Sequence, residues 1–160
     1  MFESLLNEIQ GDFSAVPAWA AFFRLSCALL LGAVIGIERE WRSKPAGLRT
    51  HILVAVAACL FVIIGQELSA LSFGDAGQQR NDPLRMIEAV TAGVAFLAAG
   101  LIVTAQGEVR NITTGASLWL AGAVGLGCGA GRITLAAMAT AMVVMVLALL
   151  KWVEVLARGR

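Results

Sequence analysis

The polar residues with the most obvious chemistry gather in three short segments, each at the end of a long apolar run. They are Glu38, Arg39, Arg49, His51, Arg110, Thr113 and Thr114. An arginine fork can meet a carboxylate with two hydrogen bonds, and a short connection joins Glu38 to Arg49, so we expect these two to pair. The segments predict one polar site on the cytoplasmic side. The alternative is a set of helix caps and interface anchors.

Catalytic and metal-binding arrangements are not indicated. His51 is the single histidine, and the cysteines Cys27, Cys59 and Cys128 lie in three different apolar runs. This leaves no ligand set for zinc or iron, and we interpret the cysteines as small packing residues. No nucleophile is spaced to work with His51, and the glycines of 125–131 lack the Lys-Ser/Thr of a phosphate loop. We therefore expect no enzyme, no metal and no cofactor.

A second group of charges lies near the opposite ends of the same runs. It comprises Arg24, Glu67 and Glu88. A charge inside a bilayer costs about 3 kcal/mol on insertion scales, so each one needs a partner. We expect Arg24 to pair with Glu67 or Glu88 at the outer surface. The alternative is that each side chain reaches the interface separately.

The elements that position these groups are membrane helices. Of the 160 residues, 59% are hydrophobic and 14% are charged, against about 25% charged in a soluble domain. A bilayer core needs roughly 20 apolar residues per helix, and the chain has five candidate runs. They are 19–37, 50–71, 84–105, 113–130 and 133–153. The sequence predicts an all-α polytopic membrane protein with about five transmembrane helices. The fourth run is rich in glycine, and a re-entrant loop is its alternative.

The positive charges predict the orientation. One side carries eight of them and the other three: Arg39, Arg42, Lys44, Arg49, Arg110, Lys151, Arg158 and Arg160 against Arg80, Arg85 and Arg132. The positive-inside rule places the N-terminus outside and the C-terminus inside. We expect an amphipathic interfacial segment at 1–18, the transmembrane domain at 19–155 and a cytoplasmic tail at 156–160. The net charge of +1 argues against nucleic-acid binding.

Small residues recur at helical spacing within the runs. Membrane helices associate through such residues because they let two backbones approach closely. The candidate packing positions are Gly32, Gly36, Gly93, Ala121, Gly125 and Gly129. The fourth run has small residues on several faces, so we expect it at the centre. A homodimer through the first and fourth runs is the favoured assembly, and tight packing within one bundle is the alternative.

Four stretches together resemble the MgtC/SapB family of bacterial membrane proteins. They are RLSCALLLGAVIGIERE (24–40), PAGLRTHILV (45–54), DPLRMIEAVTAGVAFLAAGLIV (82–103) and VRNITTGASLWLAGAVGLGCGAG (109–131). Two departures stand out. The family's GIGFLGAG-like third helix has alanine at Ala95 and Ala98, and its Arg-Gly-Leu-Thr-Thr segment is Arg-Asn-Ile-Thr-Thr at 110–114. We expect the short, SapB-like type, without the C-terminal cytosolic domain of virulence-associated members.

The resemblance implies a multi-pass protein of the bacterial inner membrane, surrounded by lipid and linked to magnesium limitation and virulence. Two functions are compatible with it. A regulatory protein would bind another membrane complex through its helices, and the small-residue stripes favour this function. A small cation transporter or channel would need polar groups at mid-membrane depth. The mid-helix residues are mostly Ala, Gly, Leu and Val, with only hydroxyls such as Thr91 and Ser117.

Overall fold

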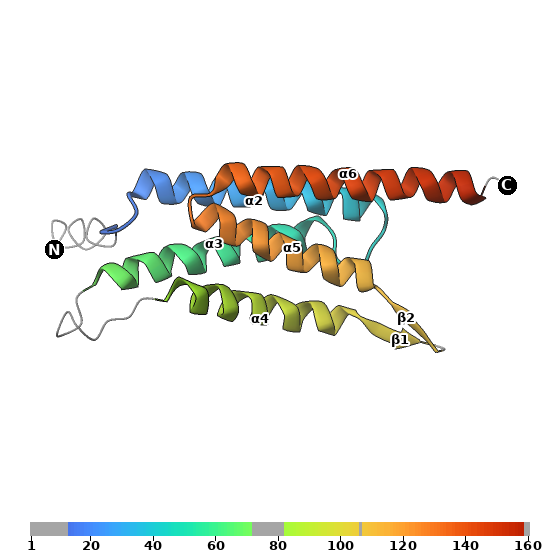
Figure 1. Ribbon diagram of the computed structural model, residues 1–160, viewed down its shortest axis with the longest axis horizontal. Helices are drawn as coiled ribbons and strands as arrows, with labels where there is room; N and C mark the ends of the chain where they lie inside the picture. The colour runs from blue at the N-terminus through green and yellow to red at the C-terminus, as the bar shows by residue number, and fades with distance from the viewer. Residues whose placement is uncertain (1–12, 72–81, 106, 159–160) are drawn as a thin grey trace.

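The computed structural model describes residues 13–71, 82–105 and 107–158. Within them lie five helices and one short hairpin (Figure 1). The helices are α2 (Ala18–Trp41), α3 (Leu48–Ala70), α4 (Pro83–Leu101), α5 (Ile112–Gly129) and α6 (Ile133–Arg158). The predicted all-α polytopic class is thereby confirmed. The fourth run is one continuous helix of 18 residues, long and apolar enough to cross a membrane.

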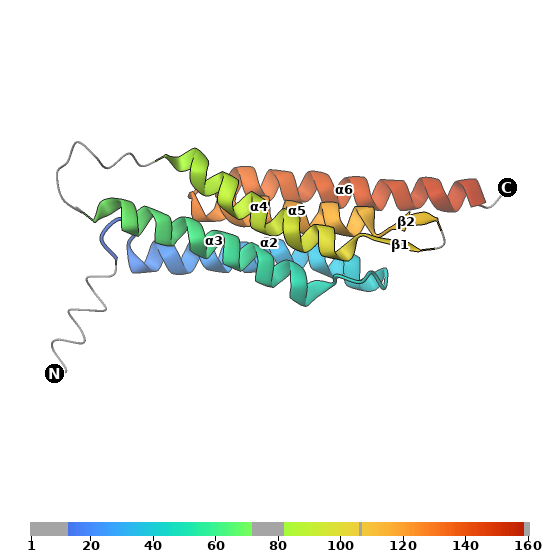
Figure 2. The same cartoon turned by 90° about the horizontal axis from the view of Figure 1, so that it is seen from below.

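Successive helices run in opposite directions and form an elongated bundle (Figures 1 and 2). One end holds the start of α2 and the end of α3, and we call it the Arg24 end. The other holds the end of α2 and the start of α3, and we call it the Arg39 end. The last turns of α6 extend beyond the other helices at the Arg39 end (Figure 1).

Four described helices meet the length and apolarity needed for a span, namely α2 to α5. The part of α6 with the same character is Ile133–Leu147. Which end of the bundle faces the cytoplasm stays a prediction from the charge distribution. The expected interfacial helix at the N-terminus falls on 1–12, outside the described residues.

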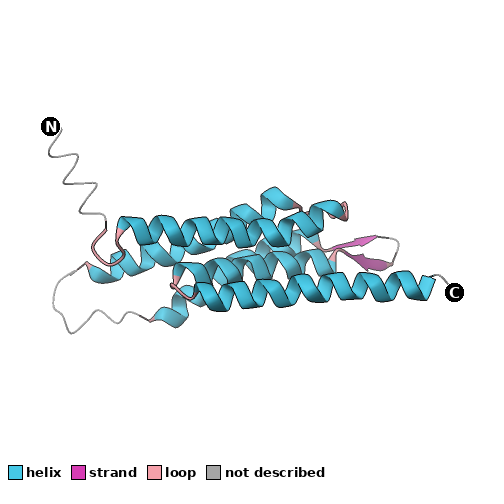
Figure 3. Ribbon diagram, turned by 90° about the horizontal axis from the view of Figure 1, so that it is seen from above, coloured by secondary structure: helices cyan, strands magenta, loops and turns pink. Residues whose placement is uncertain are grey.

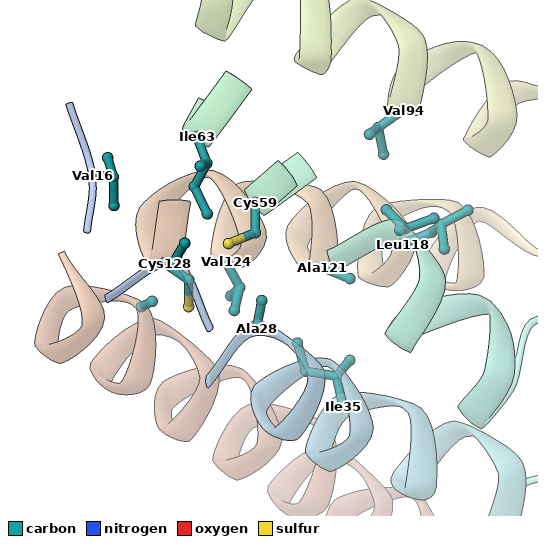
Figure 4. Packing of buried hydrophobic residues seen from close by; sticks show 13 residues of the cluster. Val16, Ala28, Ile35, Cys59, Ile63, Val94, Leu118, Ala121, Val124 and Cys128 are labelled. Atoms are coloured by element: carbon teal, nitrogen blue, oxygen red, sulfur yellow. The ribbon is translucent and has the colours of Figure 1, made fainter. Parts of the chain in front are cut away.

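Helix α5 is the centre of the bundle, as the sequence predicts. It contacts α2, α3, α4 and α6, and its buried residues include Leu118, Ala121 and Cys128. Figure 4 shows these side chains packed with Cys59 of α3 and Ile35 of α2. The three cysteines are free thiols, two of them buried, so they pack as apolar residues.

The helices approach one another through glycine. A Cβ atom at Gly32 would lie 2.9 Å from the Cβ of Ala55, and one at Gly125 would lie 2.1 Å from the Ala55 carbonyl oxygen. The small-residue surfaces of α2 and α5 are thus filled within one chain. Gly93 of α4 differs, because no atom lies within 4 Å of the corresponding position.

The third run was expected to stay helical to residue 105, and this is wrong. Helix α4 ends at Leu101, and strands β1 (Val103–Ala105) and β2 (Glu108–Arg110) form an antiparallel hairpin (Figure 3). The chain then turns at Asn111, whose φ is 66°. Asparagine tolerates this left-handed conformation better than most residues, so it suits the turn before α5. Its side chain donates to the Leu101 carbonyl over 3.1 Å rather than capping α5.

Candidate functional site

A buried arginine is the centre of the polar site at the Arg39 end. Helix α2 continues to Trp41, which places Arg39 one turn beyond Ile35 on the buried face. Only 1% of Arg39 is exposed. Its Nη2 donates to Thr114 Oγ1 over 2.7 Å, linking α2 to α5. Its Nε atom is buried and has no hydrogen-bond partner among the described residues.

His51 joins the same site from α3. Its Nδ1 lies 2.8 Å from the Gly47 carbonyl, and a carbonyl only accepts, so Nδ1 carries the hydrogen. Its Nε2 lies 3.1 Å from Ser117 Oγ, and this hydroxyl also reaches the Thr114 carbonyl over 2.9 Å. The serine has a single hydroxyl hydrogen, so it donates either to Nε2 of the neutral ring or to the Thr114 carbonyl. We name Arg39, His51, Thr114 and Ser117 the Arg39 cluster.

The expected ion pair between Glu38 and Arg49 is wrong. Glu38 instead pairs with Arg42, one turn further along α2. Arg42 also donates to the Leu147 carbonyl, which ties α2 to α6. Helix α3 begins at Leu48, so Arg49 is already helical and points away from His51. Arg49 is exposed.

The remaining predicted residues do not enter the cluster. Thr113 is exposed, and so is Arg110, whose guanidinium lies 3.7 Å from the Glu108 carboxylate of the same hairpin. Of the seven predicted residues, the structure joins Arg39, His51 and Thr114 across three helices, with Glu38 beside them on α2.

Two participants were missed at the sequence level. Ser117 lies three residues after Thr114, so the helical period already places both on one face of α5. Glu40 accepts a hydrogen bond from the Leu48 amide over 2.9 Å and thereby caps α3. The first amides of a helix lack partners within it, and a nearby carboxylate satisfies one of them. A glutamate eight positions before the first residue of a helix does not form a recognised capping pattern, so the sequence carries no signal for Glu40.

At the Arg24 end, the expected pairing of Arg24 with Glu67 or Glu88 is also wrong. Arg24 Nη1 donates to Gln66 Oε1 over 2.9 Å and to the Gly129 carbonyl over 2.8 Å. Neutral acceptors on α3 and α5 therefore hold the guanidinium. Glu88 is exposed on α4 and belongs to neither ion pair of the described residues.

Glu67 binds backbone instead of a cation. Its two oxygens accept hydrogen bonds from the amides of Ser14, Ala15 and Val16, at 2.8, 3.0 and 2.7 Å, and from the Ser14 hydroxyl at 2.9 Å. One carboxylate thus fixes the segment before α2 against the end of α3, and this segment places Val16 in the core.

Replacing Glu67 with alanine should release that segment. Because the three amides lose their shared acceptor, we expect faster hydrogen–deuterium exchange in the peptide covering Ser14–Val16, and little change in α5. The matched control is Glu88→Ala, which removes an exposed carboxylate from α4. Unchanged exchange at Ser14–Val16 would contradict the role given to Glu67.

Between the two polar ends the described core is apolar. The buried residues there include Ala28, Cys59, Ala121 and Val124. Thr140 is buried too, but its hydroxyl donates to the Ala136 carbonyl of its own helix. The described residues contain no group of three or more His, Cys, Asp or Glu that could hold a metal ion. The polar groups therefore fix the helices at each end without forming a path between the ends.

Comparison with known proteins identifies the family of the chain. The sequence pattern of the MgtC family matches residues 25–156, which include all the helix-to-helix hydrogen bonds of the Arg39 cluster. The chain belongs to the MgtC family. Protein MgtC of Brucella abortus (strain 2308) is 44% identical over 127 residues, 79% of this chain and 50% of the relative. Protein MgtC of Salmonella typhimurium (strain LT2) is 37% identical over 119 residues, 74% of this chain and 47% of the relative.

The chain spans about half the length of the MgtC relatives that it matches. No solved structure matches it. Family membership and the apolar helices make it a multi-pass protein of the bacterial inner membrane. In this MgtC family member, the Arg39 cluster connects the segments IERE, AGLRTH and TTGAS, which lie in three of the four stretches that carried the resemblance.

Proposed function

We propose that this MgtC family member is a regulatory protein that binds another membrane protein through α4 and acts in adaptation to magnesium limitation. The supporting observation is that α4 buries only Val94 and Ala98 within the chain. It packs mainly on α5 and lies at the edge of the bundle (Figure 1). An apolar helix with one narrow buried face has a wide surface left for a partner.

The surface opposite Val94 has the small residues that membrane helices use for association. Ala92, Phe96 and Ala99 follow one another at spacings of four and three, and all are exposed. They define the outer face of α4, in which Phe96 is 80% exposed. Gly100 beside them has no atom within 4 Å of its Cβ position.

Glu88 lies four residues before Ala92 and extends the same face toward the Arg24 end. A carboxylate on a membrane helix needs a partner or access to the interface. Within the described chain Glu88 has no ion pair. A basic or hydrogen-bond-donating side chain on a partner protein would complement it.

The homodimer that the sequence predicts is proposed for the same face. Its original basis was the small-residue surface of α2 and α5, but Gly32, Gly36, Gly125 and Gly129 are occupied inside one chain. The outer face of α4 is where described small residues are still free to meet a second copy.

Cysteine crosslinking tests this surface. Phe96→Cys is introduced together with Cys27→Ala, because Cys27 is the native cysteine that is not fully buried. We expect oxidation in native membranes to give a crosslinked product, at twice the chain mass for a homodimer and at another mass for a second protein. Phe22→Cys on α2, at a side chain 74% exposed, is the control and should stay uncrosslinked. Equal yields at the two positions would contradict a specific surface.

A growth assay tests the regulatory role. In a strain lacking its own gene, the wild-type chain should restore growth at low magnesium, and Glu88→Gln should restore it less while accumulating in the membrane to the same level. Purified wild-type protein in liposomes should give no magnesium, potassium or proton flux above that of empty liposomes. A flux that the protein supports would favour transport and overturn the proposal.

A further inference from the structure

A cavity that is open on one side lies between α4 and the rest of the bundle, near the Arg24 end. It has a volume of about 940 Å³ and is bounded by α3, α4, α5 and the start of α6. A second apolar groove of about 700 Å³ separates α4 from α3. The two spaces share Met86, Val90 and Val94. Helix α4 therefore contacts α3 only sparsely, with Met86 against Gly65, and the two spaces adjoin this contact.

The chemistry of the first space changes along its length. Asp82 and Arg132 line it immediately before the first turns of α4 and α6, so they mark the end nearest the membrane surface. Val94 lies twelve residues beyond Asp82, at a depth of about 18 Å for a helical rise of 1.5 Å per residue. The deeper walls are mainly apolar, with Val62 and Leu126 lining the space and Thr91 as a polar residue of the α4 wall. The space thus has a polar mouth and an apolar interior.

Arg132 provides the positive charge at the mouth of the space. The carboxylate of Asp82 already accepts a hydrogen bond from the Leu84 amide over 3.0 Å. The Arg132 side chain is exposed and takes part in no ion pair or side-chain hydrogen bond among the described residues. A planar guanidinium binds a phosphate through two parallel hydrogen bonds.

We propose that this cavity is a phospholipid site, in which Arg132 binds the phosphate and one acyl chain fills the apolar interior. Water does not suit the interior, because an ordered water needs two to four polar partners. A flexible acyl chain fits both the volume and the apolar walls, and the proposal is independent of the regulatory role.

Native mass spectrometry of the purified full chain in mild detergent tests the site with three probes: phosphatidylglycerol, diacylglycerol and inorganic phosphate. We expect one phosphatidylglycerol to bind the wild type. Arg132→Gln should weaken that binding about tenfold, as for loss of a charged hydrogen-bonded contact, and leave diacylglycerol binding unchanged. Arg85→Gln, an exposed arginine at the start of α4 outside the cavity, is the matched control.

Larger side chains that fill the cavity test whether the acyl chain binds in its interior. Ala123 lines the cavity, so Ala123→Phe should reduce binding of both lipids. Ala95→Phe, on an exposed part of α4 that lines neither space, should leave both unchanged. If Ala123→Phe does not give a folded protein, Thr91→Leu fills the same cavity from α4. Equal lipid binding by filled and control variants overturns the site, and so does inorganic phosphate that binds as tightly as the lipid.

Discussion

Replacing Gly125 with alanine is expected to destabilise the chain more than any other single methyl group added to the bundle. The new Cβ would lie 2.1 Å from the Ala55 carbonyl oxygen and 2.9 Å from the Ala55 Cα. Overpacking usually costs about 1–3 kcal/mol when side chains can adjust. Here the obstacle is the backbone of α3, so we expect a loss of at least about 3 kcal/mol.

Thermal unfolding in detergent measures this effect. Gly93→Ala is the matched control, because the same methyl group enters open space on α4. We expect the control to unfold at or above the wild-type temperature, since alanine is the better helix former. Melting temperatures that agree between Gly125→Ala and Gly93→Ala would contradict the direct packing of α5 on α3.

The second large effect concerns the Arg39 cluster. Thr114→Val removes the acceptor of Arg39 Nη2 and leaves a buried charge without it. Hydrogen bonds to charged groups contribute about 1.5–3 kcal/mol, and we expect a loss of stability in that range. Arg39→Met should be tolerated better, because exchanging a buried charge for an apolar side chain of similar volume is often neutral or stabilising.

A double-mutant cycle tests the coupling. Thr114→Val should have little effect when Arg39 is already methionine, so the double variant should lose less than the sum of the single losses. Strictly additive losses would disprove the contact. Arg49→Met, at the exposed start of α3, is the control and should not couple to Thr114→Val.

The same variants separate packing from function. Only 1% of Arg39 is exposed, so the side chain is shielded from a soluble ligand. We therefore expect a folded Arg39→Met chain to support growth at low magnesium. A folded but inactive Arg39→Met chain would instead assign the cluster a direct role.

The sequence predicts those parts of the structure that depend on periodicity. The buried residues of α3, from His51 through Ala55 and Cys59 to Val62, follow helical spacing. The small residues on several faces of the fourth run predict that α5 lies at the centre. Arg39, His51 and Thr114 lie together because each is a polar residue on such a buried face. Ser117 could have been found by the same argument, as it lies one turn beyond Thr114.

The ion pairs failed for a different reason. The prediction paired residues of opposite charge, but Arg24 and Glu67 both bind backbone groups. Arg24 binds the Gly129 carbonyl, and Glu67 binds the Ser14–Val16 amides. Every residue carries those groups, so no sequence pattern marks which of them is within reach. The predicted Glu38–Arg49 pair was wrong because it depended on where α3 begins. Helix α3 begins at Leu48, so Arg49 is already helical and the helix sets the direction of its side chain.

The sparse contact of α4 with α3, beside two unfilled spaces, bears on how the chain is made. Helices α2 and α3 contact each other directly and can pack as soon as both are in the bilayer. Helix α4 enters next, but it touches α3 only sparsely, and its main partner, α5, has not yet been synthesised. During biogenesis α4 must therefore remain a separate helix in lipid until α5 inserts between it and the α2–α3 pair. The arrival of α5 therefore captures a helix that is already in the membrane, and α6, which contacts α2 and α5, packs after it.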